Sequence, residues 1–126
     1  MKSRILLCLI LMAGLMFGSQ PALAASGAVR EMAGIMVHLE HFPSDAEKGK
    51  LKSIADNMAS TVQESVLARA IMNLKHKAAA EDKDKLKQVM DDSSAPAEVR
   101  ELAGIILNLN HMPSAADKSK LEQMMK

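Results

Sequence analysis

Cysteine and aromatic side chains are almost missing from this 126-residue chain, which has one cysteine, two phenylalanines, no tryptophan and no tyrosine. Cys8 lies in an apolar N-terminal segment, so the rest of the chain has no thiol. This excludes a disulfide framework and CxxC redox or zinc chemistry. The scarcity of rings also argues against sites that stack carbohydrates or nucleobases. The core has to be built from Leu, Ile, Val, Ala and Met, with methionine filling irregular gaps.

An excess of one charge and the common catalytic motifs are also missing. Basic and acidic residues nearly balance, at 16 and 15, so the basic surface of a nucleic-acid-binding protein is not expected. The chain has no GxSxG, no glycine-rich phosphate loop, no HExxH and no CxxCH. We therefore predict that the protein is not an enzyme.

The N-terminal segment has the features of a secretory signal peptide. Lys2 and Arg4 precede an uncharged apolar run from Ile5 to Phe17, and Ala22-Leu23-Ala24 supplies small residues for a signal peptidase. The run is shorter than the roughly 20 residues of a membrane span. We interpret residues 1–24 as a cleaved signal peptide and residues 25–126 as one periplasmic or secreted domain without stable membrane insertion. An uncleaved anchor is the alternative.

The remaining sequence repeats with a period of 35 residues. VREMAGIMVHLEHFPSDAEKGKLKSIAD, from Val29, matches VRELAGIILNLNHMPSAADKSKLEQMMK, from Val99, at about half of its positions without a gap. A weaker copy, ESVLARAIMNLKHKAAAEDKDKLKQVMD, begins at Glu64 in the same phase. We place the repeats at about residues 29–63, 64–98 and 99–126.

Each copy predicts two helices. Apolar residues recur at i, i+1, i+4 and i+7, then at i, i+3 and i+4, and both spacings are helical. A matched alanine in the first helix, together with Gly34 and Gly104, indicates close helix packing. The sequence therefore predicts an all-α fold of three tandem helix-turn-helix hairpins, stacked as a short solenoid or a compact bundle, because one hairpin cannot bury its apolar face alone.

Turn signals support these helices, except in the second copy. Pro43 and Pro113 end the first helix of their copies. Predicted N-terminal caps or starts of helices are Ser44 with Glu47, Ser114 with Asp117, Thr61 with Glu64, and Pro96. Copy two instead has Lys77-Ala78-Ala79-Ala80, so its two helices could also fuse into one of about 30 residues.

Histidine recurs once per copy, as His41, His76 and His111, and His38 lies three residues before His41. Imidazole is the commonest metal ligand, so these residues are candidate ligands for copper, zinc or haem. We prefer the interpretation that they cap helix C-termini, where histidine favours the helix dipole. Stacked hairpins would hold successive histidines about 10 Å apart, too far to share one ion. Under the preferred interpretation, in which the histidines cap helices, no cofactor is predicted.

Methionine and lysine give weaker signals. The eight methionines of residues 25–126 suggest soft copper ligation, yet most stand where sister copies have Leu or Ile, as packing predicts. A repeated lysine pattern on the second helix could hold an acidic partner or anionic lipid, but it is more typical of a solvated face. Its members are Lys48, Lys83 and Lys118, and Lys50, Lys85 and Lys120.

Two functions remain after these exclusions. The first is an exported, non-catalytic helical-repeat module that binds or scaffolds a protein or peptide partner, which predicts an exposed apolar patch or groove. The alternative is a periplasmic metal- or haem-binding protein that uses one histidine per repeat, which predicts imidazoles within a few ångströms of one another. The sequence leaves the oligomeric state open.

Overall fold

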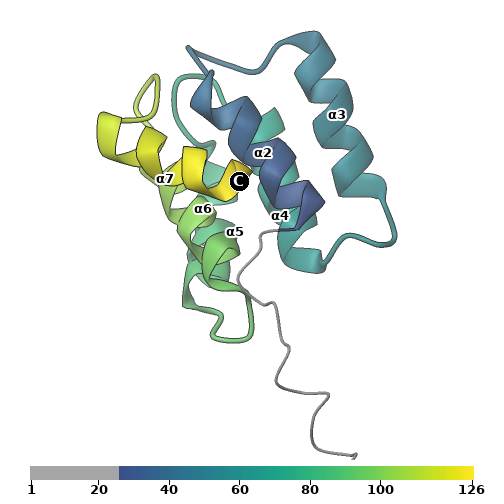
Figure 1. Cartoon of the computed structure of the whole chain (residues 1–126). Helices are drawn as coiled ribbons and strands as arrows, with labels where there is room; N and C mark the ends of the chain where they lie inside the picture. Colours follow the sequence, from purple (N-terminus) through teal and green to yellow (C-terminus); the bar gives the residue numbers. More distant parts are fainter. Residues whose placement is uncertain (1–25) are drawn as a thin grey trace, which may run out of the picture.

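The computed structural model describes residues 26–126 as an all-helical domain of six helices without a strand. The predicted signal peptide lies outside these residues. Within the described part, no helix combines the length and the apolar character that crossing a membrane requires. The helices are α2 (Gly27–Val37), α3 (Asp45–Asp56), α4 (Val62–Met72), α5 (Ala80–Asp91), α6 (Ala97–Leu107) and α7 (Ala115–Met125) (Figure 1).

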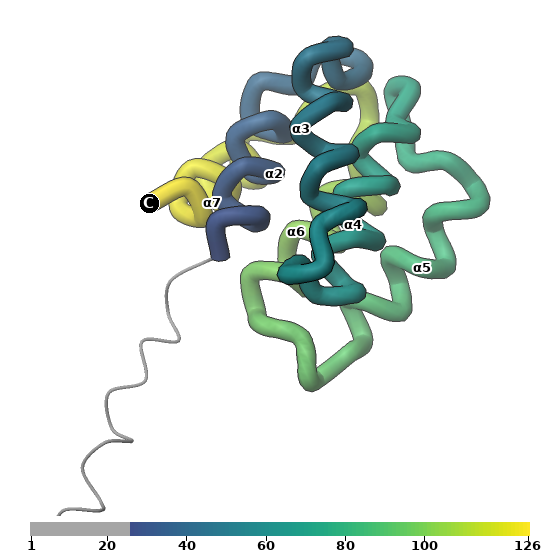
Figure 2. The backbone as a smooth tube through the Cα atoms, turned by 90° about the vertical axis from the view of Figure 1, so that its right-hand side faces the viewer, coloured from purple at the N-terminus to yellow at the C-terminus, as the bar shows by residue number. Residues whose placement is uncertain are grey.

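The helices form a compact, closed arrangement. Three of them, α2, α4 and α6, contact one another, while α3 packs on α4, α5 on α6 and α7 on α2 (Figure 2). Each of these outer helices contacts its packing partner more extensively than the helix that precedes it in the chain. Because the last helix covers the first, the ends of the array meet, which an open solenoid would not allow.

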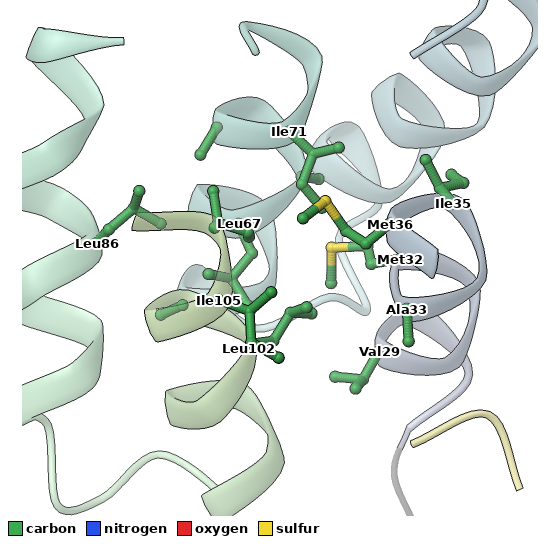
Figure 3. Close-up of a cluster of buried hydrophobic side chains, with 14 of the residues drawn as sticks. Val29, Met32, Ala33, Ile35, Met36, Leu67, Ile71, Leu86, Leu102 and Ile105 are labelled. Atoms are coloured by element: carbon green, nitrogen blue, oxygen red, sulfur yellow. The ribbon is translucent and has the colours of Figure 1, made fainter. Parts of the chain in front are cut away.

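The core lies between the three central helices and is built from aliphatic and methionine side chains. Met32 and Met36 of α2 face Leu67 and Ile71 of α4 in this core (Figure 3), and all four are fully buried. Each such side chain contributes about 1.5–3 kcal/mol through burial. Leu102 and Ile106 of α6 stand at the positions matching Met32 and Met36 and are also fully buried. These methionines therefore serve packing.

Small residues let the outer helices approach the central ones. Ala33, Ala68 and Ala103 are fully buried. A Cβ atom on Gly34 would lie 3.6 Å from Cε of Met125, and one on Gly104 would lie 3.4 Å from Cε of Met90. A methionine of the packed outer helix therefore covers each of these glycines, as close packing predicts.

The helix starts follow the predicted caps with two differences. Ser44 with Glu47 and Thr61 with Glu64 form complete capping boxes, and the Ser114 side chain accepts from the Asp117 N–H. Pro96 occupies the N-cap position of α6 and not its first turn. Ala79, the N-cap of α5, offers no side-chain hydrogen bond, so that helix begins without the cap its counterparts have.

The second copy does not form one fused helix. α4 ends at Met72 and α5 begins at Ala80, so residues 73–79 form a loop. His76 in this loop has a φ of 70°, which a right-handed helix does not allow. Its N–H donates to a carbonyl of the preceding copy and not to its own helix. The high helix propensity of alanine favours the fused alternative, but the hydrogen bond between the loops of His76 and His41 overrides this propensity.

Candidate functional site

The repeated histidines lie in loops beyond the helix ends. The C-cap residues of α2, α4 and α6 are His38, Asn73 and Asn108. His41, His76 and His111 each follow the cap by three residues and are exposed to solvent. This corrects the expectation that they cap the helices, because the helices end earlier than the sequence pattern indicated.

Backbone hydrogen bonds join the three loops through the histidines themselves. The N–H of His76 donates to the carbonyl of His41 at 2.9 Å, and the N–H of His111 donates to the carbonyl of His76 at 2.7 Å. His76 and His111 have φ values of 70° and 71°, in the left-handed region. That conformation costs about 1–2 kcal/mol for a residue with a side chain. The inter-loop bonds satisfy the N–H groups that this turn directs outward.

The three imidazoles consequently form a compact cluster. The ring centres of His41 and His76 are 4.9 Å apart, those of His76 and His111 are 4.9 Å apart, and those of His41 and His111 are 6.0 Å apart. This corrects the expected spacing of about 10 Å between successive units. The spacing of helix axes does not apply, because the closed arrangement brings all three loops to one end of the domain (Figure 1).

These ring distances are close to those of a site with three histidines and one ion. An ion about 2.1 Å from each of three imidazole nitrogens, in tetrahedral geometry, places the ring centres roughly 5 Å apart. Within residues 26–126, however, no group of three or more His, Cys, Asp or Glu side chains is arranged so that it could hold a metal ion. Ligation of one ion by the three histidines therefore requires the exposed rings to rotate about their side-chain torsions.

A neighbouring amide favours one tautomer of His111. Its Nδ1 lies 2.9 Å from the Oδ1 of Asn110. Because that oxygen can only accept a hydrogen bond, Nδ1 carries the proton and the lone pair stays on Nε2. Orientation of a histidine through its second nitrogen is typical of metal ligands.

Helix dipoles give the same end of the domain a preference for positive charge. Each histidine loop follows the C-terminus of one central helix, α2, α4 or α6. The C-terminus of a helix carries a partial negative charge of about half an elementary charge. Three such ends next to one cluster favour a cation over an anion there.

Two hollows border the histidine cluster. One lies beside His41 and is lined by His38, Leu39, Glu40, His41, Phe42, Ser44 and Glu47. The other lies beside His76 and is lined by Phe42, Lys48, Met72, Leu74, Lys75 and His76. His38 therefore shares a hollow with His41 and is not one of the three clustered rings. The sequence pattern did not single out Phe42, which borders both hollows.

The carboxyl groups with shifted pKa values lie elsewhere. The hydrogen bond and positive charge of Lys52 lower the pKa of Asp56 at the end of α3. Hydrogen bonds from the Ser94 side chain, from Gln63 and from the Ser94 backbone lower the pKa of Asp92 after α5. Both groups favour the ionised form at loops that join consecutive copies, and neither lies in a histidine loop.

No protein-family model, curated protein or solved structure matches the chain. Function therefore has to be inferred from these residues and their geometry.

Proposed function

We propose that this protein is an exported, non-catalytic metal-binding protein that holds one transition-metal ion between His41, His76 and His111. The observation that carries the proposal is the triangle of ring centres, with sides of 4.9, 4.9 and 6.0 Å. Three residues of one kind, from loops far apart in the sequence, meet at that point.

A threefold repeat explains why the histidines meet. The central helices begin at Gly27, Val62 and Ala97, and the outer helices at Asp45, Ala80 and Ala115, so equivalent helices start 35 residues apart. In our interpretation, three copies of one helix pair are arranged around a common axis, each outer helix packing on a neighbouring copy. Residues at the same loop position of every copy then lie at similar distances from that axis, and the short distances between the histidine rings place them close to it.

The arrangement favours a single ion over haem. Haem takes axial ligands on opposite faces of a plane, whereas these three rings surround one point. Imidazole nitrogens suit zinc and copper, and affinity for a given site rises towards Cu(II) and falls again at Zn(II). The protein should therefore bind Cu(II) more tightly than Zn(II), both through imidazole nitrogens of the histidines.

A titration calorimetry experiment on residues 25–126 tests the proposal with Zn(II) and Cu(II). Asparagine tolerates the left-handed backbone at His76 and His111, so the matched set is His41→Asn, His76→Asn and His111→Asn. We expect one ion per chain at micromolar or tighter affinity, and a loss of at least tenfold, about 1.4 kcal/mol, with each substitution. His38→Asn is the control and should bind as the parent chain does.

The result against the proposal is equally clear. If the parent chain binds no ion, or if His38→Asn weakens binding as much as the three cluster substitutions do, the cluster is not the site. Metal affinity should also fall as the pH is lowered, because protons compete with the ion for imidazole nitrogens.

Binding of a protein or peptide partner is the second candidate. Phe42 and Met112, which follow two of the clustered histidines, are 59% and 47% exposed and would suit an apolar partner surface. The other large exposed apolar side chains, Met58, Val62, Met90 and Met125, belong to other helices and loops. This scattered pattern supports a docking surface less directly than the ring geometry supports an ion.

A further inference from the structure

We infer that the end of the domain with the three histidine loops is a contact surface for a second copy of this chain. The surface, called the end face below, consists of the clustered histidines and the residue on either side of each. These six flanking residues are Glu40, Phe42, Lys75, Lys77, Asn110 and Met112. The inference goes beyond the proposed metal site and does not depend on it, because it uses no bound ion.

The end face is continuous, although its residues come from three copies of the repeat. The ring centres of His41, His76 and His111 are at most 6.0 Å apart, and every flanking residue is the direct chain neighbour of one of these histidines. Backbone hydrogen bonds between the histidines join the three loops. All six flanking residues are exposed to solvent, so a partner can reach them together.

Two large apolar side chains belong to the end face. Phe42 is 59% exposed and Met112 is 47% exposed. Phe42 is also the only Phe, Tyr or Trp residue within residues 26–126, and it lies outside the core. Aromatic residues and methionine are enriched where protein surfaces meet, so both side chains suit a contact that buries them.

The flanking residues give each loop a different charge. Glu40 makes the first loop acidic, Lys75 and Lys77 make the second loop basic, and the third loop has only uncharged flanking residues. The ion pairs of residues 26–126 involve other side chains. Charges of both signs on the end face are therefore available to a partner.

A twofold axis makes the end face complementary to itself. In a twofold dimer the same patch of both subunits is in contact. An axis that passes between the first two loops places Glu40 of one copy opposite Lys75 and Lys77 of the other, and this contact occurs twice. The Phe42 ring then also meets ammonium groups, which is a favourable cation–π arrangement. An axis through the second loop would instead oppose four lysines, so the charges select the first arrangement.

The total charge of the end face permits contact between two copies. The six flanking residues have a formal charge of 2 − 1 = +1. The loops follow the C-termini of α2, α4 and α6, which contribute partial negative charge. These two contributions oppose each other, so two end faces with neutral imidazoles meet with little net repulsion.

Charge reversal with complementation provides the test. Residues 25–126 are studied by analytical ultracentrifugation with a metal chelator at about pH 8, where imidazole is neutral. We expect a monomer–dimer equilibrium at micromolar to millimolar concentration, weakened by salt because exposed charges are screened. Glu40→Lys, and separately Lys75→Glu with Lys77→Glu, should each raise the dissociation constant by about tenfold or more, since like charges then face each other.

The decisive sample is an equimolar mixture of the two reversed proteins. In the mixed dimer each first loop again faces a second loop of opposite charge, so dimers should form as readily as in the parent chain. Because misfolded variants could not complement each other, restored dimers would also show that both variants are folded.

Matched controls change the same charges elsewhere. Glu122→Lys in α7, and Lys85→Glu with Lys87→Glu in α5, alter exposed residues outside the histidine loops and should dimerise as the parent chain does. A parent chain that stays monomeric at millimolar concentration would overturn the inference. So would a mixture that stays monomeric, or controls as disruptive as the end-face variants. Because the chelator removes metal ions, none of these outcomes bears on the proposed metal site.

Discussion

His76 and His111 have a backbone conformation that few residues with side chains adopt. Their φ values of 70° and 71° fall in the region that favours glycine. Glycine would remove the strain, yet each position has histidine. Strain retained at a position is often connected with function, and here the side chain is the proposed ligand.

Substitutions at His76 should separate this strain from the role of the ring. We expect His76→Ala to be less stable than His76→Gly by about 1 kcal/mol, because alanine keeps the left-handed penalty and glycine does not. The measurement is the free energy of unfolding from urea titrations of metal-free protein.

His41 is the control for that comparison, because its φ is not among the positive values. At this position His41→Gly should be the less stable variant, since glycine loses more backbone entropy on folding. If the alanine variant is less stable than the glycine variant at both positions, or more stable at both, the assigned backbone geometry is wrong.

At the level of elements, α5 differs from the outer helices of the other two copies. Ser44 and Ser114 each accept a hydrogen bond from the backbone three residues later, whereas Ala79 makes no such bond. The second copy has a different contact, because Asn73 donates to the buried carboxylate of Asp82 at 3.0 Å. This side-chain bond connects the end of α4 to the start of α5.

Restoring the missing cap should stabilise the domain. We expect Ala79→Ser to raise the free energy of unfolding by about 0.5–1 kcal/mol, because a serine hydroxyl at the N-cap position can accept from a backbone N–H in the first turn of α5. Ser114→Ala is the reciprocal change and should lower stability by a similar amount. Chemical denaturation of both variants checks the prediction, and an unchanged midpoint for Ala79→Ser would contradict it.

For the whole molecule, the packing of α7 on α2 is decisive. This contact closes the arrangement, and it places Met125 against Gly34 near the end of the chain. The other two close pairs, α3 with α4 and α5 with α6, are joined by short loops. The pair α7 and α2 is held together only by packing.

A circular permutant tests whether the arrangement is closed. Lys126 is joined to Ser26 through Asn-Met-Ala-Ser, a copy of residues 57–60, and the chain is opened after Met58, which is fully exposed. We expect a stability within about 1 kcal/mol of residues 25–126, because one surface loop replaces another of similar length. Circular dichroism and urea denaturation provide the measurement.

A second permutant, opened between Lys77 and Ala78, is the matched control. This break lies next to His76, whose N–H and carbonyl both bond to neighbouring loops, so it should be clearly less stable than the first permutant. If the first permutant fails to fold, a short linker cannot join α7 to α2. That outcome would contradict the closed arrangement.

The local pattern of the sequence was sufficient for the helices. Apolar residues at helical spacing, together with Ser44, Thr61 and Ser114 at their caps, predicted the helical segments because these signals act within one or two turns. The same local reasoning left two possibilities open around His76. The alanine-rich segment left a continuous helix open as the alternative there, and the structure has a loop whose His76 N–H bonds to another loop.

The sequence by itself determined that the described domain is all-helical, that its core lacks aromatic rings, and that histidine recurs at one position of each copy. Tertiary structure alone decided that those histidines are neighbours. Whether equivalent positions lie along a line or around an axis depends on the angle between successive helix pairs, which results from packing across the whole core. Here that packing brings α7 onto α2, so His41, His76 and His111 meet at one end of the domain.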